Sequence, residues 1–370
     1  MATKIVGVGV KGTVAGLVVT FDRPISGDGL TFFVTGNFLL NLSTGTSFDI
    51  TAITRDASDK NKITSVTLSS TAGWSTGDFF ALLTDSGTTT FSTISAAISA
   101  ASAGDEVIVY PRTNFGDRQV ISVGIINVGI DITIETDAIG EKNIITKNAN
   151  DGFRATSACT IRDFIIGRGQ AGVRISSTTG EVVVERMVFI GCDNGINKES
   201  QAGSVRVKNC VSLFSRQSGY SAGGGGTLAF ENCAALYNGL SGFVRQGGTM
   251  TCNNCVSYRN PVNFNLISSG DNNVSDTASI PTGTGNLINQ TLDQVRPAFD
   301  FITGQPWDWR FLDGGNSVLE DGGKVIAGLT LDIDGRTRDG TTPNIGPTED
   351  FTQFGPPTIG RQIRARHHNV

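Results

Sequence analysis

The chain has little charge, little proline and almost no histidine. Lys, Arg, Asp and Glu make up 17% of its 370 residues, against roughly 25% in an average domain. Proline occurs 10 times, and the two histidines, His367 and His368, both lie in the C-terminal tail. A histidine-dependent catalytic triad needs a firmly positioned imidazole, so the placement of these two residues argues against one.

Long apolar runs and a strong charge bias are also missing. No stretch approaches the roughly 20 apolar residues that span a bilayer, and glycines interrupt the short apolar run between Lys4 and Lys11. We therefore expect no signal peptide and no membrane insertion. The net charge of −5, with its only basic run in the tail (360–370), gives no reason to expect nucleic acid as a partner.

Glycine, by contrast, is abundant. It occupies 47 of the 370 positions, where roughly 7% is usual. Thr, Ser, Val and Ile are plentiful as well. Many β-branched residues combined with many glycines are typical of an all-β protein with numerous tight turns.

A repeat with a period in the low twenties occupies the middle of the chain. The pair Asn-Cys recurs at intervals of 23 and 22 residues, and the same spacing extends towards the N-terminus. Such a period is typical of a solenoid. We predict the coils of a parallel β-helix, in which stacked coils turn equivalent positions into ladders. The apolar column is Phe164, Met187, Cys210, Cys233 and Cys255, and the polar column before it is Asp163, Arg186, Asn209, Asn232 and Asn254.

These two columns have different expected places in a coil. We predict that the apolar column points into the core. The polar column is expected at a bend, because asparagine tolerates left-handed backbone angles and can bond the backbone of the next coil.

The recurring cysteines do not predict a metal site. Zinc needs four ligands converging at about 2.3 Å from the metal. Stacked coils would instead place Cys210, Cys233 and Cys255 in a line, about 4.8 Å apart. We interpret them as small buried hydrophobic residues.

The residues before the repeat predict a short capping helix. Apolar residues recur at helical spacing from Ile94 to Ala101, Ser92 or Thr93 can cap the N-terminus, and Gly104 ends the helix. A strand over 106–110 follows. A helix in this place is expected to cover the open end of the first coil, as terminal units of solenoids require.

Three stretches resemble the pectate-lyase-like superfamily of right-handed parallel β-helices. They are FSTISAAISAASAGDEVIVYP (91–111), ENCAALYNGLSGFVRQGGTMTCNNCVSYRN (231–260) and WDWRFLDGGNSVLEDGGKVIAGLTLDIDGRTRDGTTPNIG (307–346). The resemblance implies an all-β chain with a right-handed parallel β-helix of about seven to nine coils, a short capping helix and a C-terminal cap. It implies less about activity, because this scaffold hosts lyases, hydrolases and non-enzymatic adhesins.

The resemblance leaves residues 1–88 outside, where short β-type runs separated by Gly and Asp indicate a separate β module. We predict four regions. They are an N-terminal module for attachment or oligomerisation (1–88), the β-helix with its capping helix (89–285), a C-terminal closing segment (286–350) and a basic tail (351–370).

This arrangement resembles bacteriophage tailspikes, fibres and capsid decoration proteins. The resemblance implies a virion structural protein that assembles in the host cytoplasm as a homotrimer. Its partners would be capsid or tail proteins, and its β-helix would bind a host surface polysaccharide.

The alternative function is a lyase or hydrolase acting on an acidic polysaccharide. Lyases of this fold resemble one another in using clustered carboxylates for Ca²⁺ and a basic side chain, and the matching local candidates are Asp163 and Asp193 for the metal and Lys198 as the base. Glu185 and Glu231 recur two coils apart, about 10 Å, a separation that permits glycoside hydrolysis. The dense aspartate cluster of the lyases is missing, so the sequence favours a protein that is not an enzyme and has no cofactor, with Ca²⁺ expected only in a lyase.

Carbohydrate binding without chemistry needs aromatic faces and cations on the outer surface. The candidates for such a surface are Arg216, Tyr237, Arg245, Tyr258 and Arg259. Ordinary packing or a subunit interface is the alternative interpretation of the same residues.

Overall fold

The structure, a computed structural model of the chain, describes residues 3–6, 10–26, 38–41, 46–55, 62–83, 89–91, 94–109, 125–136, 142–146, 150–176, 180–199, 203–295, 297, 311 and 317–349. Contacts divide the chain into two compact units, Met1–Gln119 and Val120–Val370. No helix among the described residues is long and apolar enough to cross a membrane.

The first unit contains a closed antiparallel barrel with the strand order β2-β3-β6-β5-β4-β7. Its strands are β2 (Val10–Ala15), β3 (Val18–Ser26), β4 (Phe38–Asn41), β5 (Thr46–Arg55), β6 (Lys62–Leu68) and β7 (Phe79–Leu83). Trp74 packs in the barrel core, with its ring 5.0 Å from Phe48 and 5.1 Å from Phe80. The short β-type runs of this region thus form one barrel, although the run at 30–36 lies outside the described residues.

Three parallel strands and one helix complete the first unit. Strand β1 (Thr3–Val6) pairs with β8 (Thr89–Phe91) on one side and with β9 (Glu106–Val109) on the other. Helix α1 (Ile94–Ala100) contacts all three strands and buries Ile94, Ala97 and Ile98. The predicted helix is confirmed, while its proposed capping residues Ser92 and Thr93 lie outside the described residues.

The barrel is an insertion between β1 and β8. Because these two strands are parallel neighbours, both connections to the barrel start from adjacent strands. The contacts place α1 and β9 in one unit with the barrel. The boundary at 88/89 and the covering of the first coil by α1 stay predictions.

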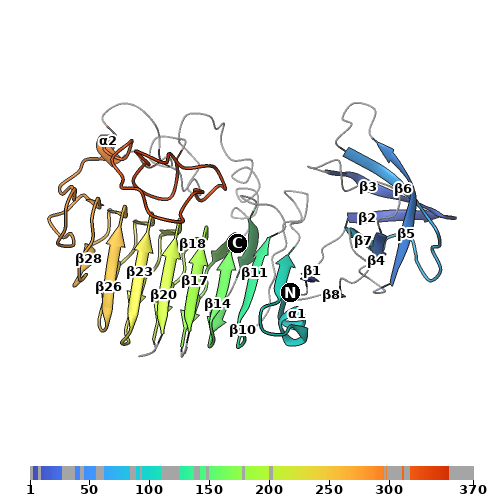
Figure 1. The fold of residues 1–370 in the computed structure, drawn as a ribbon, viewed down its shortest axis with the longest axis horizontal. Helices are drawn as coiled ribbons and strands as arrows, with labels where there is room; N and C mark the ends of the chain where they lie inside the picture. The colour runs from blue at the N-terminus through green and yellow to red at the C-terminus, as the bar shows by residue number, and fades with distance from the viewer. Residues whose placement is uncertain are drawn as a thin grey trace, which may run out of the picture. The chain divides into compact units, whose positions relative to one another are not determined.

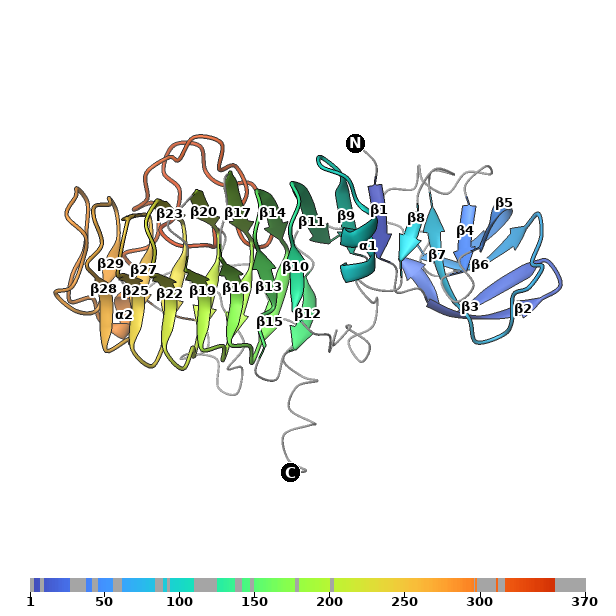
Figure 2. The ribbon, with the colours of Figure 1, turned by 90° about the horizontal axis from the view of Figure 1, so that it is seen from below.

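The second unit is a solenoid of three parallel sheets, and each coil passes once through each sheet (Figures 1 and 2). The first sheet contains β11 (Ile132–Thr136), β14 (Cys159–Arg162), β17 (Glu181–Glu185), β20 (Ser204–Lys208), β23 (Thr227–Glu231) and β26 (Thr249–Asn253). The second sheet contains β12 (Asn143–Thr146), β15 (Phe164–Gly167), β18 (Val188–Ile190), β21 (Val211–Leu213), β24 (Ala234–Leu236), β27 (Val256–Tyr258) and β29 (Val274–Ser275). The third sheet contains β10 (Ile126–Val128), β13 (Phe153–Ala155), β16 (Ala171–Ile175), β19 (Asn194–Lys198), β22 (Ser218–Ala222), β25 (Ser241–Arg245) and β28 (Val262–Asn265).

The predicted parallel β-helix is confirmed, but the expected number of coils is too high. The described residues form six coils that pass through all three sheets, from β11–β13 to β26–β28. The count of about seven to nine assumed regular coils over nearly the whole span from 89 to 285. Part of that span is α1, and the residues after β28 stack as irregular segments with few ladder pairs.

In the five coils from β14 to β28, two turns per coil are made by single residues with left-handed backbone angles. The first corner, between the first and second sheets, consists of Asp163, Arg186, Asn209, Asn232, Asn254 and Asn272, with φ between 50° and 67°. The second corner, between the second and third sheets, consists of Arg168, Gly191, Phe214, Tyr237 and Arg259, with φ between 54° and 63°. The expected bend at the polar column is confirmed.

The core of the solenoid is a set of stacked side-chain ladders. The predicted inward column is fully buried from Phe164 to Cys255. Phe243 lies between Tyr220, at 4.9 Å, and Phe264, at 5.0 Å between ring centroids. A glycine precedes Tyr220 and Phe243 because the chain is crowded there: a Cβ at Gly242 would lie 2.0 Å from Ser257 Oγ.

The closing segment (317–349) lies over the outer face of the second sheet, together with α2 (Leu292–Val295) (Figure 1). It runs back along the solenoid, since its backbone oxygens accept hydrogen bonds from successive side chains of the first corner. The bonds are Asn272 Nδ2 to Gly322 O (2.7 Å), Asn254 Nδ2 to Lys324 O (2.7 Å) and Asn209 Nδ2 to Leu331 O (2.6 Å). Residues 317–349 thus cover a side of the solenoid, and a cap over its C-terminal end stays a prediction.

Candidate functional site

The two carboxylates proposed for glycoside hydrolysis lie in a charge ladder along the first sheet. The strand register aligns Arg162, Glu185, Lys208 and Glu231 in that order. Glu185 accepts a hydrogen bond from Arg186 at 2.9 Å, and both oxygens of Glu231 lie 3.1 Å from Arg206 Nη2. The two glutamates share a face as predicted. Lys208 lies between them, and each glutamate is also paired with an arginine: Glu185 with Arg186 and Glu231 with Arg206.

Asp163, proposed as a metal ligand, is part of a buried ion-pair network at the first corner. Arg186 donates to both of its oxygens, at 2.9 and 2.7 Å, and Lys142 Nζ lies 3.9 Å from Oδ1. Burial opposes the charge on Arg186, but the hydrogen bonds and charge of Asp163 outweigh it and raise the pKa of Arg186. Burial lowers the pKa of Lys142, an effect that Asp334 and Asp163 partly offset.

The other lyase candidates lie apart from Asp163. Asp193 pairs with Arg216 at 2.5 Å, close to the second corner. Lys198 ends β19 beside Ala222, is only 1% exposed and donates a hydrogen bond to Gly225 O. Burial lowers the pKa of Lys198. Within the described part of the chain, no three His, Cys, Asp or Glu side chains are grouped as metal ligands.

The proposed sugar-binding residues divide into three environments. Arg216 and Arg259 are exposed at the second corner, where Tyr237 is partly buried between them. Tyr258 is only 1% exposed, with its ring 6.0 Å from that of Tyr237 and 5.5 Å below the Arg259 guanidinium. Arg245 lies at the end of β25, where it donates to Gly248 O at 2.9 Å. An aromatic and cationic surface is therefore present only around Arg216, Tyr237 and Arg259.

The cysteine columns carry no reactive thiol. All six cysteines are buried and free. Burial raises the pKa of Cys192 to about 11 and that of Cys159 to about 12. Burial likewise raises the pKa values of Cys210, Cys233 and Cys255 well above the ordinary thiol value. The interpretation of these residues as buried hydrophobic groups agrees with the structure.

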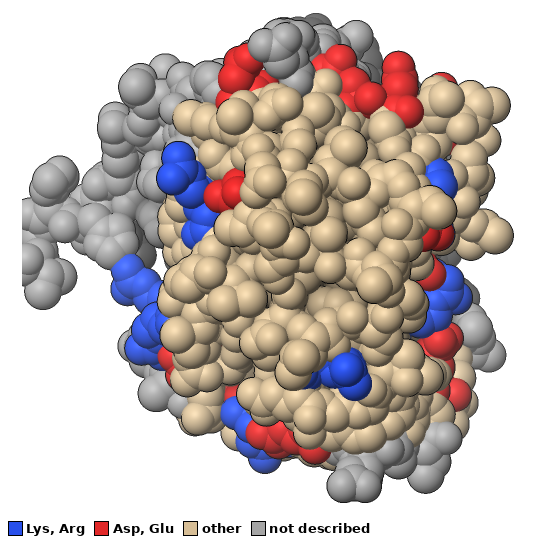
Figure 3. All heavy atoms as spheres, turned by 90° about the vertical axis from the view of Figure 1, so that its left-hand side faces the viewer, with Lys and Arg blue, Asp and Glu red and all other residues tan. Residues whose placement is uncertain are grey.

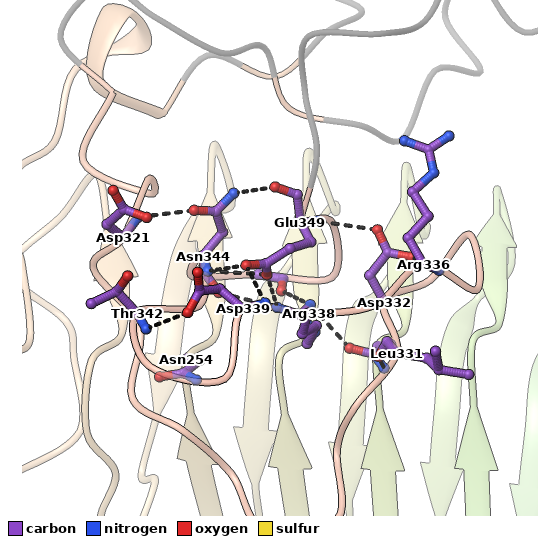
Figure 4. Close-up of polar contacts among 12 residues, drawn as sticks. Asn254, Asp321, Leu331, Asp332, Arg336, Arg338, Asp339, Thr342, Asn344 and Glu349 are labelled. Carbon is purple, nitrogen blue, oxygen red and sulfur yellow. Dashed lines mark hydrogen bonds and ion pairs between the residues drawn. The ribbon is translucent and has the colours of Figure 1, made fainter.

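The polar network that the sequence reasoning missed lies in the closing segment (Figure 4). Asp332 is fully buried, and its carboxylate accepts hydrogen bonds from the backbone N–H groups of Asp334, Arg336 and Glu349 at 2.8 to 3.1 Å. These bonds fold the Asp-x-Asp-Gly sequence at 332–335 into a tight turn.

Arg338 joins this turn to the solenoid. Its guanidinium donates to Glu349 Oε2 at 2.8 Å and to Asn209 Oδ1 at 3.1 Å, although Asn209 lies 129 positions earlier in the chain. The conspicuous Asp-Gly-x-x-Arg spacing was the one signal in the sequence that could have indicated this role.

Comparisons with known proteins add a single weak similarity. No family model matches the chain, and no curated protein matches it. A solved structure titled "Crystal structure of pectate lyase Pel9A" matches with 13% sequence identity and a TM-score of 0.40, over 70% of this chain and 90% of that one. A similarity this low transfers neither an activity nor site residues. The parallel β-helix of this chain rests on its own strand pairing.

Proposed function

We propose that the chain is a structural protein of a bacteriophage virion, of the tailspike, fibre or capsid decoration type. The observation that supports a structural role is that the candidate catalytic side chains are engaged within the stack. Glu185 binds Arg186, Glu231 binds Arg206, Asp193 binds Arg216, and Lys198 binds the backbone of Gly225. The contacts of Glu231, Asp193 and Lys198 join neighbouring coils, whereas Glu185 and Arg186 belong to the same coil.

The barrel is the proposed attachment module. Both of its connections arise from the neighbouring parallel strands β1 and β8. A module held at two points resists being pulled away better than one on a single linker, as attachment to capsid or tail proteins requires. We further propose that the chain assembles as a homotrimer in the host cytoplasm, and that Arg216, Tyr237 and Arg259 at the second corner contact a host surface polysaccharide.

The second candidate function is a lyase or hydrolase of an acidic polysaccharide. One observation favours it: Glu185 and Glu231 lie on the same face of the first sheet, two strands and about 10 Å apart. That separation permits an inverting glycosidase, which needs space for a water molecule between its carboxyl groups.

Two measurements on the purified chain separate these functions. The structural proposal predicts a trimer that resists dissociation by SDS at room temperature, and no cleavage of pectin or alginate with Ca²⁺ present. A monomer that produces unsaturated sugars or new reducing ends from these polymers would overturn it and support the enzyme. The virion proposal also predicts capsid and tail genes beside this gene, whereas sugar-utilisation genes there would contradict it.

A further inference from the structure

The C-terminal end of the solenoid is an almost uncharged surface. Between Asp276 and Asp293 the sequence contains no Lys, Arg, Asp or Glu. Figure 3 views the solenoid from this end, and charged side chains gather towards its margins, apart from one cation in the lower part of the view. The charge ladder of the first sheet shows that side surfaces of the same solenoid do carry fixed charges.

This end is formed by an irregular last coil that is held firmly on one side. Residues 282–287 stack on residues 270–275, through Gly270 N to Thr282 O (3.0 Å), Asn272 N to Thr284 O (2.8 Å), Leu287 N to Asn273 O (2.8 Å) and Ser275 N to Leu287 O (2.9 Å). The Asn286 amide bridges the two segments, since it accepts from Asn273 Nδ2 and donates to Gly270 O. The opposite side of this coil faces away from the stack, and among the described residues no further segment pairs with it.

Exposed apolar side chains are concentrated near the same end. Among the described residues, six large hydrophobic side chains are exposed: Leu17, Leu240, Val262, Leu266, Ile288 and Val325. Leu17 belongs to the barrel, and the other five belong to the last two regular coils, the terminal coil and the adjacent part of the closing segment. These five lie around the perimeter of the solenoid near this end: Leu240 and Val262 where strands of the third sheet begin, Leu266 after β28, Ile288 after β29, and Val325 beside the first corner.

We propose that this end of the solenoid binds the same end of a second copy of the chain, around a two-fold axis. A two-fold contact places each group close to its own counterpart, so any charge near the axis would face a like charge. An end without charge between Asp276 and Asp293 avoids that repulsion and retains apolar side chains to bury. This contact is independent of the proposed virion function and of the proposed trimer. If other surfaces of the chain form a trimer, the end contact joins two trimers; if the chain is a monomer, it forms a dimer.

The test is sedimentation velocity of the full chain from about 1 to 100 µM, a range that covers weak to moderate self-association. The wild type should double in mass as concentration rises. The variant L266R/I288R adds two cations to each copy of this end, and its dissociation constant should rise at least about tenfold. The matched control is Leu17→Arg, which replaces the exposed leucine of the barrel and should associate as the wild type does.

A second readout uses the absence of reactive thiols in the chain. Thr282→Cys, Thr284→Cys and Ile288→Cys each place one accessible thiol at the end, while the six native cysteines are buried. Mild oxidation should join copies of at least one of these variants into covalent pairs, whereas Leu17→Cys should stay unjoined.

A wild-type mass that is constant over the range, or a Leu17→Arg variant that loses the doubling as fully as L266R/I288R, would overturn the proposal. Circular dichroism confirms that each variant is folded.

Discussion

The two corners of the solenoid turn the backbone in the same way but carry different side chains. Both place single residues at φ near 55°, in the left-handed region that most side chains disfavour. The first corner holds mostly asparagines, and the closing segment covers it through hydrogen bonds to their side chains. The second corner holds arginine and aromatic residues, with Arg168 and Arg259 exposed.

The comparison shows that backbone geometry does not by itself select asparagine. Where the corner is covered, the side chain must satisfy buried backbone groups of the closing segment, and an amide can both donate and accept. Where the corner is open, that demand disappears, and residues with a poor left-handed preference such as Phe214 and Tyr237 occupy it because they pack against their neighbours. The expected size of a mutational effect therefore depends on the corner more than on the residue type.

The largest difference is expected between two arginines at equivalent turns. Arg186→Ala leaves the buried Asp163 carboxylate without its two hydrogen bonds, and breaking a buried pair costs about 3–5 kcal/mol. Arg259→Ala removes the contact of an exposed guanidinium over Tyr258, about 0.5–1 kcal/mol at an exposed site. The free energies of unfolding come from urea titrations of both variants. Equal losses would refute the distinction between the corners.

A smaller difference is expected between two asparagines of the first corner. Asn209→Ala loses the bonds to Leu331 O and from Arg338, whereas Asn232 Oδ1 has no hydrogen-bond partner among the described residues. Both variants place alanine in a left-handed turn, so this cost cancels. Asn209→Ala should be less stable than Asn232→Ala by about 1–3 kcal/mol, the penalty for buried groups left unpaired. If Asn232→Ala is the more damaging change, contact with the closing segment is not what selects asparagine at this corner.

The smallest effect is expected in acid, at the Asp271–Lys324 pair that ties the closing segment to the last coil. The hydrogen bond from Lys324, with one from the backbone N–H of Thr284, lowers the pKa of Asp271 below its ordinary 3.8. Because the pKa of Asp271 is lower in the folded protein, the unfolded chain binds this proton more readily. The ion pair therefore stabilises the fold above the ordinary pKa of aspartate. This stabilisation is lost as the pH falls through the pKa that Asp271 has in the folded protein.

Asp271→Asn should therefore reduce the thermal midpoint at neutral pH slightly and flatten its decline below about pH 4. The measurement is a series of melting curves from neutral to acid pH. A variant whose curve stays parallel to that of the wild type would show that this carboxylate does not contribute. Asp293→Asn, in α2, is the control carboxylate.

The stacking of the coils could be predicted from the sequence, whereas the contacts between the coils and the closing segment could not. A period of 22 or 23 residues forces equivalent positions into register, so the column from Phe164 to Cys255 and the bend before it followed from spacing alone. Contacts between Asn209 and residues 331–338 leave no periodic trace, because they join a repeat to a segment that does not repeat. The number of coils was overestimated because α1 occupies part of the span. In addition, the segments after β28 keep the asparagines but lose the regular spacing.

The candidate sites were less predictable because their chemistry depends on partners supplied by neighbouring coils. Lys198 lies in a loop-like sequence, yet the glycine-rich turn of the next coil buries it. Tyr258 and Arg259 are adjacent in sequence, yet Tyr258 is buried in the apolar cluster between the second sheet and the closing segment, whereas Arg259 is exposed. The closing segment buries Tyr258, and the spacing of the repeat carries no trace of that cover.

The most direct test of a structural role is to measure stability and polysaccharide turnover together in the variant E185Q/E231Q. The account predicts that the wild type turns over no acidic polysaccharide and that the variant loses stability, because Arg206 loses the charge of Glu231 and Arg186 keeps only one of its two charged partners, Asp163. Turnover by the wild type that disappears in the variant, with unfolding unchanged, would contradict the account and identify the two glutamates as catalytic.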